Sequence, residues 1–144
     1  MGGRTSSELL SLPVRLHGIQ VGWPVDLVLD PVSLRVLGLE VRCGDGAHRF
    51  LALAAARVGV DEIAIDSGLT LVDDLAYYRR SGTALTALRG GPVERGGRVL
   101  GALKDVRVAS DGSLVSVVAV SADGETEAPA AAVRLEERAR ASAA

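Results

Sequence analysis

The stretch PVRLHGIQVGWPVDLVLDPVSLRVLGLEV, residues 13–41, returns without a gap 79 positions later as PVERGGRVLGALKDVRVASDGSLVSVVAV, residues 92–120. The two stretches share seven identities in 29 positions, where composition alone would give about three. The identities are Pro13, Val14, Gly18, Gly22, Asp26, Val36 and Val41. Because the shared glycines stand where a strand should turn or bulge, the matches follow a β template. We therefore expect one small β unit to occur twice in the chain.

Alternating apolar and polar residues predict strands in both copies. In the first copy, the residues from Val21 to Leu29 place every second side chain on one face, and Asp61–Asp66 alternates in the same way. Asp45-Gly46 marks a hairpin turn, since glycine accepts a positive φ without a steric clash. The strands expected in the second copy cover residues 84–88, 98–108 and 114–120, with turns at Asp111-Gly112 and Asp123-Gly124.

A helix is predicted between the two copies. Thr70 and Asp73 have the spacing of a capping box, and Leu71, Leu75 and Tyr78 share one helical face. The expected layout is a disordered N-terminus (1–8), a first unit (9–69), a linker helix (70–82), a second unit (83–136) and a disordered tail (137–144).

The composition bounds the class of protein. Of 144 residues, 48% are apolar and 24% are charged, with a net charge of −2, which argues against a disordered chain and makes nucleic-acid binding unlikely. The apolar runs are too short for a membrane span, and no secretory signal is evident. A single cysteine, Cys43, excludes an internal disulfide. Fifteen arginines, one lysine and no asparagine suggest a GC-rich bacterial genome, so we expect a bacterial cytoplasmic protein.

No catalytic or metal-binding pattern is evident. Cys43 and His48 are five positions apart, but no third group is recognisable that would orient a base beside a nucleophile. A metal site would have to combine these two residues with His17 and remote carboxylates, without the spacing of known zinc sites. The paired glycines at 90–91 and 96–97 lack the lysine and hydroxyl of a phosphate loop. No enzyme activity, cofactor, metal or small-molecule substrate is therefore expected.

Asp26 and Asp105 recur together with Gly22 and Gly101, at equal spacing in the two copies. The structural interpretation is that each carboxylate accepts hydrogen bonds from local backbone N–H groups beside a turn. The functional alternative makes the two carboxylates ligand-binding or proton-handling groups. We favour the structural interpretation, because a role found in both copies is more naturally geometric.

Two sets of residues are candidates for binding a partner. Tyr77, Tyr78, Arg79 and Arg80 combine the side-chain types enriched at interface hot spots. Alternatively, Tyr78 packs into the fold while the arginines cap the helix C-terminus. Trp23, the single tryptophan, is either a core residue or an exposed anchor, and we favour the core position.

The residues from 9 to 75 resemble the PRC-barrel family through Gly22, Asp26, Gly38, Arg49 and the run 61–65, and residues 88–135 match it more loosely. The resemblance implies an all-β fold of two small PRC-barrel-like halves joined by a short helix. The family is known for protein contacts and not for a shared catalytic site, so the resemblance implies a binding or scaffold module.

We therefore expect a non-catalytic protein-binding or self-associating module, with a homodimer as the favoured assembly because open sheet edges seek partners. One alternative is a ribosome-associated or other RNA-contacting assembly factor, which the slightly acidic balance disfavours. A further alternative is a small hydrolase that uses Cys43 and His48.

Overall fold

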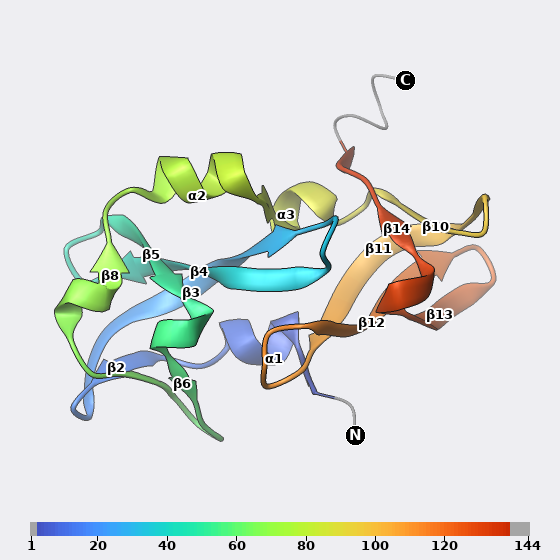
Figure 1. The fold of residues 1–144 in the computed structure, drawn as a ribbon. Helices are drawn as coiled ribbons and strands as arrows, with labels where there is room; N and C mark the ends of the chain where they lie inside the picture. Colours follow the sequence, from blue (N-terminus) through green and yellow to red (C-terminus); the bar gives the residue numbers. More distant parts are fainter. Residues whose placement is uncertain (1–2, 139–144) are drawn as a thin grey trace.

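The computed structural model describes residues 3–138, which form two sheets (Figure 1). The strands of the first sheet are β2 (Val14–Leu16), β3 (Ile19–Asp30), β4 (Arg35–Cys43), β5 (His48–Ala52), β6 (Arg57–Val58), β7 (Ile63–Ile65), β8 (Leu71–Val72) and β9 (Thr83–Ala84). Their order is β6-β7-β2-β3-β4-β5-β8, and β9 pairs with β3. All of these pairs are antiparallel except β2 with β7.

The second sheet is antiparallel throughout. Its strands are β1 (Arg4–Thr5), β10 (Pro92–Arg95), β11 (Arg98–Val108), β12 (Leu114–Ser121), β13 (Gly124–Pro129) and β14 (Arg134–Leu135). Their order is β13-β12-β11-β10-β14, and β1 pairs with β11. The helices are α1 (Ser6–Leu10), α2 (Leu75–Ser81) and α3 (Leu85–Leu88), with 3-10 turns η1 (Leu53–Ala55), η2 (Gly68–Thr70) and η3 (Ala130–Ala132). The predicted all-β class is confirmed.

The element order β1-α1-β2-β3-β4-β5-η1-β6 is repeated as β9-α3-β10-β11-β12-β13-η3-β14. The irregularities of the ladders repeat as well. In β3 the register shifts between Pro24 and Asp26, and in β11 it shifts between Leu103 and Asp105. β7, η2, β8 and α2 lie in the segment that joins the halves, and they have no counterpart in the second half as far as residue 138.

The gapless alignment of residues 13–41 with 92–120 is wrong beyond the first hairpin. Leu29 pairs with Val36 and Val108 pairs with Leu114, so the offset falls from 79 to 78 residues after the turn. The burial of the side chains supports the offset of 78 residues, because Val36 and Leu114 are both in the core. Val115, which an offset of 79 would align with Val36, is 39% exposed. The cause is that six residues separate the paired Leu29 and Val36, whereas five separate the paired Val108 and Leu114.

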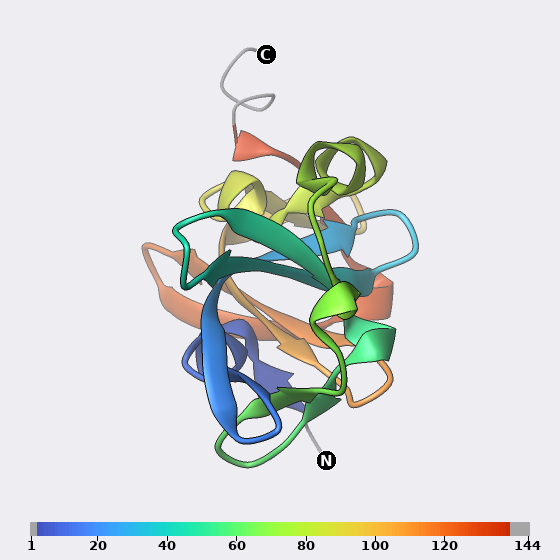
Figure 2. The ribbon, with the colours of Figure 1, turned by 90° about the vertical axis from the view of Figure 1, so that its left-hand side faces the viewer.

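The two halves exchange their first elements. β1 leaves its own half to pair with β11 of the second, and β9 pairs with β3 of the first (Figures 1 and 2). The prediction of a disordered stretch over residues 1–8 is therefore wrong for its described part. Thr5 and Glu8 form a capping box that starts α1, and α1 packs between the halves. The predicted strand at 84–88 is also wrong beyond Ala84, since Leu85 and Leu88 reach the core from one turn of helix.

One hydrophobic cluster spans both halves, with Val14, Leu27 and Leu39 from the first and Val93, Val106 and Val117 from the second. Neither sheet is closed within the described residues, so the arrangement as two barrels is not confirmed. The linker helix is shorter than predicted, since α2 begins only after the N-cap Asp74. Apart from residues 137 and 138, the predicted disordered tail lies outside the described residues.

Candidate protein-binding surface

Asp26 joins the two halves from a position directly after the bulge in β3. Its carboxylate is 7% exposed and accepts the N–H of Leu27 at 2.9 Å, as the structural interpretation predicts. It also accepts the hydroxyl of Thr86 at 2.7 Å and the N–H of Thr86 at 3.3 Å. Thr86 belongs to α3, so the carboxylate holds the exchanged segment of the second half onto the first.

Asp105 repeats this arrangement in β11, with the exchanged segment now coming from the first half. Its carboxylate accepts the N–H of Val106 at 2.7 Å, the N–H of Ser6 at 3.1 Å and the hydroxyl of Ser7 at 2.8 Å, and the hydroxyl of Ser6 also donates to it. Burial alone would raise the pKa of Asp105, but the donors and the nearby Arg89 hold it below its ordinary value. Donors of the chain itself occupy both carboxylates, which supports the structural interpretation.

Gly22 and Gly101 are equivalent, since they pair with Val14 and Val93 at matching positions of the two halves. A Cβ on Gly22 would lie 2.6 Å from the carbonyl oxygen of Arg42, and a Cβ on Gly101 would lie 2.5 Å from that of Val120. Both glycines are therefore required by the close approach of the neighbouring strand.

The helix α2 packs on the outer face of the first sheet (Figures 1 and 2). Leu75 is buried, and the ring of Tyr78 stacks on Phe50 with centroids 3.7 Å apart. Arg79 donates to the buried carboxylate of Glu40 at 2.5 Å. Of the candidate partner-binding residues, Tyr78 and Arg79 thus hold the helix in place, although the side chain of Arg79 is itself 52% exposed. Tyr77 and Arg80 are exposed.

Glu40 is the most deeply buried acid in contact with α2. Its side chain is 5% exposed and lies 2.5 Å from both Arg79 and the Nδ1 atom of His48. Burial would raise the pKa of Glu40, but the hydrogen bonds with His48 and Arg79 outweigh burial and hold the pKa below its ordinary value. An ionised carboxylate only accepts, so the proton of the His48 bond lies on Nδ1.

These contacts predict a loss of stability in acid. The pKa of Glu40 is lower in the fold than its ordinary value of 4.5, so its stabilisation is complete above that value and is lost as pH falls through the folded-state pKa. We expect the free energy of unfolding, measured with urea, to fall between about pH 5 and pH 2, and Glu40→Gln to reduce that fall by about 1 kcal/mol.

The matched control is Glu62→Gln, because the ion pair of Glu62 with Arg15 is about a third exposed and exposed pairs contribute little. An unchanged pH dependence in Glu40→Gln would contradict the prediction.

Trp23 lies on β3 opposite Arg42, and Arg42 lies opposite His48 on β5. Cross-strand partners share a face, so these three side chains form a row on the outer face of the first sheet. Trp23 is 44% exposed, which excludes the fully buried core position that the sequence favoured. Arg42 and His48 are also exposed, and the sequence did not single them out as a surface.

The structure does not bring Cys43 and His48 together as a nucleophile and its base. His48 shares the outer face with Glu40 and bonds to it, whereas Cys43 faces the core and its thiol lies 3.9 Å from the carbonyl of Val41. Among residues 3–138, no three His, Cys, Asp or Glu side chains are placed to hold a metal ion. None of the helices in that range is long and apolar enough to cross a membrane.

The strand β13 is an open edge that the sequence did not reveal. In the first half, β8 pairs antiparallel with the outer edge of β5 at Phe50 and Leu51. The positions equivalent to Phe50 and Leu51 are Glu127 and Ala128 of β13, since Leu51 and Ala128 pair with the equivalent residues Leu39 and Val117. Within the described chain no strand pairs with the outer edge of β13. Five of its six residues are exposed.

No protein-family model matches the chain, and a search of curated proteins finds no similar sequence. The resemblance to the PRC-barrel family therefore stays a prediction, and the function has to be inferred from the geometry.

Proposed function

We propose that this chain is a non-catalytic module that binds an extended segment of a partner protein along the outer edge of β13. The observation that carries the proposal is the pairing of β8 with β5, because the chain itself places a strand at the equivalent edge. An exposed edge presents unpaired N–H and C=O groups to a strand from another protein, which adds by main-chain hydrogen bonds. Protein contact is also what the resemblance to the PRC-barrel family implies.

The side chains of β13 define the chemistry of the partner segment. In the first half, Leu71 of β8 lies opposite Leu51 on the core side, and Val72 lies opposite Phe50 on the outer side. At the equivalent positions of β13, Ala128 is buried and Glu127 is exposed. A segment that docks antiparallel should therefore alternate an apolar side chain toward the core with a basic side chain toward the acid.

The same acids work against self-association through this edge. Glu125 and Glu127 share the outer face of β13 because they are two positions apart. A two-fold antiparallel pairing of β13 with a second copy, centred on any residue from 125 to 127, sets a glutamate opposite a glutamate. Like charges directly opposite destabilise a sheet, and the ion pairs of Glu125 with Lys104 and of Glu127 with Arg107 offset only part of that repulsion. We therefore favour a different protein as the partner over the homodimer that the sequence predicts.

A photo-crosslinking residue placed at Thr126, on the open edge, tests the proposal in cells of the source organism. We expect a crosslinked adduct whose attachment site, mapped by mass spectrometry, is an extended segment with alternating apolar and basic residues. With the isolated partner, Glu127→Arg should weaken binding about fivefold, since it replaces attraction by repulsion.

The control places the same crosslinker at Leu69, which is 89% exposed but lies on η2, away from β13. Equal adducts from both positions would contradict binding at the edge. An adduct of the chain with itself would support the homodimer instead.

A further inference from the structure

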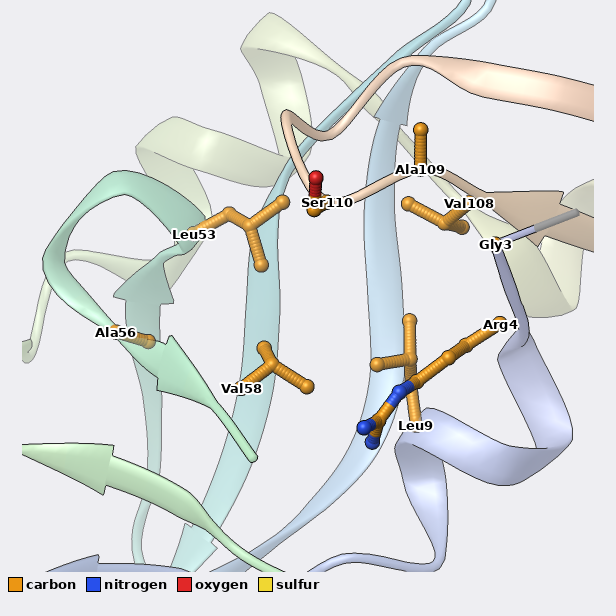
Figure 3. Close-up of a pocket in the computed structure, with 9 residues that line it drawn as sticks. All are labelled: Gly3, Arg4, Leu9, Leu53, Ala56, Val58, Val108, Ala109 and Ser110. Atoms are coloured by element: carbon orange, nitrogen blue, oxygen red, sulfur yellow. The ribbon is translucent and has the colours of Figure 1, made fainter. Parts of the chain in front are cut away.

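A hollow of about 290 Å³ lies where the two halves meet, separate from the β13 edge (Figure 3). On one side, the first half contributes Leu53 of η1, Val58 of β6 and Ala56 between these two elements. Across the opening lie the exchanged N-terminal segment, with Leu9, and the end of β11, with Val108. The volume is at the small end of the range for ligand pockets, and aliphatic side chains form most of the wall.

Two polar side chains line this hollow, Arg4 and Ser110. Figure 3 shows the guanidinium of Arg4 directed into the opening beside Leu9 and Val58. Among residues 3–138, neither the guanidinium of Arg4 nor the hydroxyl of Ser110 forms a hydrogen bond or an ion pair. The charge of Arg4 contributes to lowering the pKa of Glu8. Glu8, however, is hydrogen-bonded to Thr5 in the capping box and does not line the hollow.

The duplication supplies an internal comparison. A second hollow lies between β14 and the β3–β4 connection, and it matches the first along one wall, where Val133 and Leu135 take the places of Ala56 and Val58. The counterpart of Arg4 is Thr83, which does not line this second hollow. There the lining includes Glu94 and Glu136 beside Arg134, so acids accompany the cation. The hollow that contains Arg4 has no acidic lining residue among those described. A cation over an aliphatic wall with no acidic lining residue is thus particular to the hollow that contains Arg4.

We propose that this hollow binds a small carboxylate with an aliphatic chain, such as a medium-chain fatty acid. The chain packs against Leu9, Val58 and Val108, and the carboxylate accepts hydrogen bonds from Arg4 and Ser110. Guanidinium is suited to this role because its donors match both carboxylate oxygens. The sequence predicts no small-molecule ligand, since residues about 50 positions apart form the hollow only after the halves exchange segments.

Titration of the full chain with octanoate, followed by backbone amide chemical shifts, tests the site, with 1-octanol as the neutral probe. We expect saturable shifts at the residues lining the hollow, and octanoate to bind at least about tenfold more tightly than octanol. Arg4→Met should remove that preference while leaving octanol affinity unchanged. Val58→Trp should block both probes by filling the hollow.

The control is Arg134→Met, which removes the cation of the second hollow and should leave octanoate affinity unchanged. Thermal unfolding of each variant checks that it is folded, and Arg4→Lys, which keeps the charge, should retain part of the preference. Equal binding of octanoate and octanol to the unaltered chain would overturn the proposal. Equal weakening by Arg4→Met and Arg134→Met, or shifts confined to other surfaces, would also overturn it.

Discussion

Replacing Asp105 with alanine is expected to lower the free energy of unfolding by about 3 kcal/mol. The change removes the acceptor for Ser6, Ser7 and the N–H of Val106, and it leaves the fully buried hydroxyl of Ser6 without its acceptor. It also removes the acid beside Arg89. Urea denaturation at neutral pH, where Asp105 is ionised, measures the loss.

The control for Asp105 is Ser7→Ala, which deletes one donor to the same carboxylate from an exposed position. It should cost about 1 kcal/mol or less. A loss below 1 kcal/mol for Asp105→Ala would show that the N-terminal segment contributes little to the stability of the fold.

Replacing Phe50 with alanine is expected to cost about 4 kcal/mol, the range found for large-to-small changes of buried aromatics. Phe50 is 1% exposed, stacks on Tyr78 and fills the space above Gly38, where a Cβ would lie 2.4 Å from its ring. The variant should therefore loosen α2 as well as the sheet. Urea denaturation gives the stability, and hydrogen exchange of the α2 amides reports the loosening.

Tyr77→Ala is the matched control, because Tyr77 lies on the same helix and is 51% exposed. It should change the free energy of unfolding by less than about 1 kcal/mol. Equal losses in the two variants would contradict the packing of Phe50 beneath α2.

Local patterns in the sequence predict the strands well. The hairpin turns at Asp45-Gly46 and Asp123-Gly124 are confirmed, because a glycine with positive φ at a tight turn depends on few neighbours. The glycines and aspartates of the repeat likewise mark equivalent positions. The repeat fails after the β3–β4 turn, where a one-residue difference in loop length reverses which valines face the core.

The features that could not be predicted from the sequence depend on contacts between distant segments. Residues 3–8 look disordered in isolation because they are small and polar, and the partner of Ser6, Asp105, is 99 positions away. The sequence does not predict the open edge of β13 either, since this edge is recognised by comparison with β8, a strand that only the first half has among residues 3–138. Composition and periodicity predict turns and which face of a strand is buried. The docking of the N-terminal segment and the open edge of β13 depend instead on which distant segments lie side by side.

The exchange of β1 and β9 sets an order of events during synthesis. The segment of β1 and α1 is made about 100 residues before its docking strand, β11, is complete at Val108. Folding normally proceeds from the N-terminus as the chain lengthens. Here a segment made early docks late, so the aliphatic side chain of Leu9 stays accessible to chaperones and proteases until β11 has been translated.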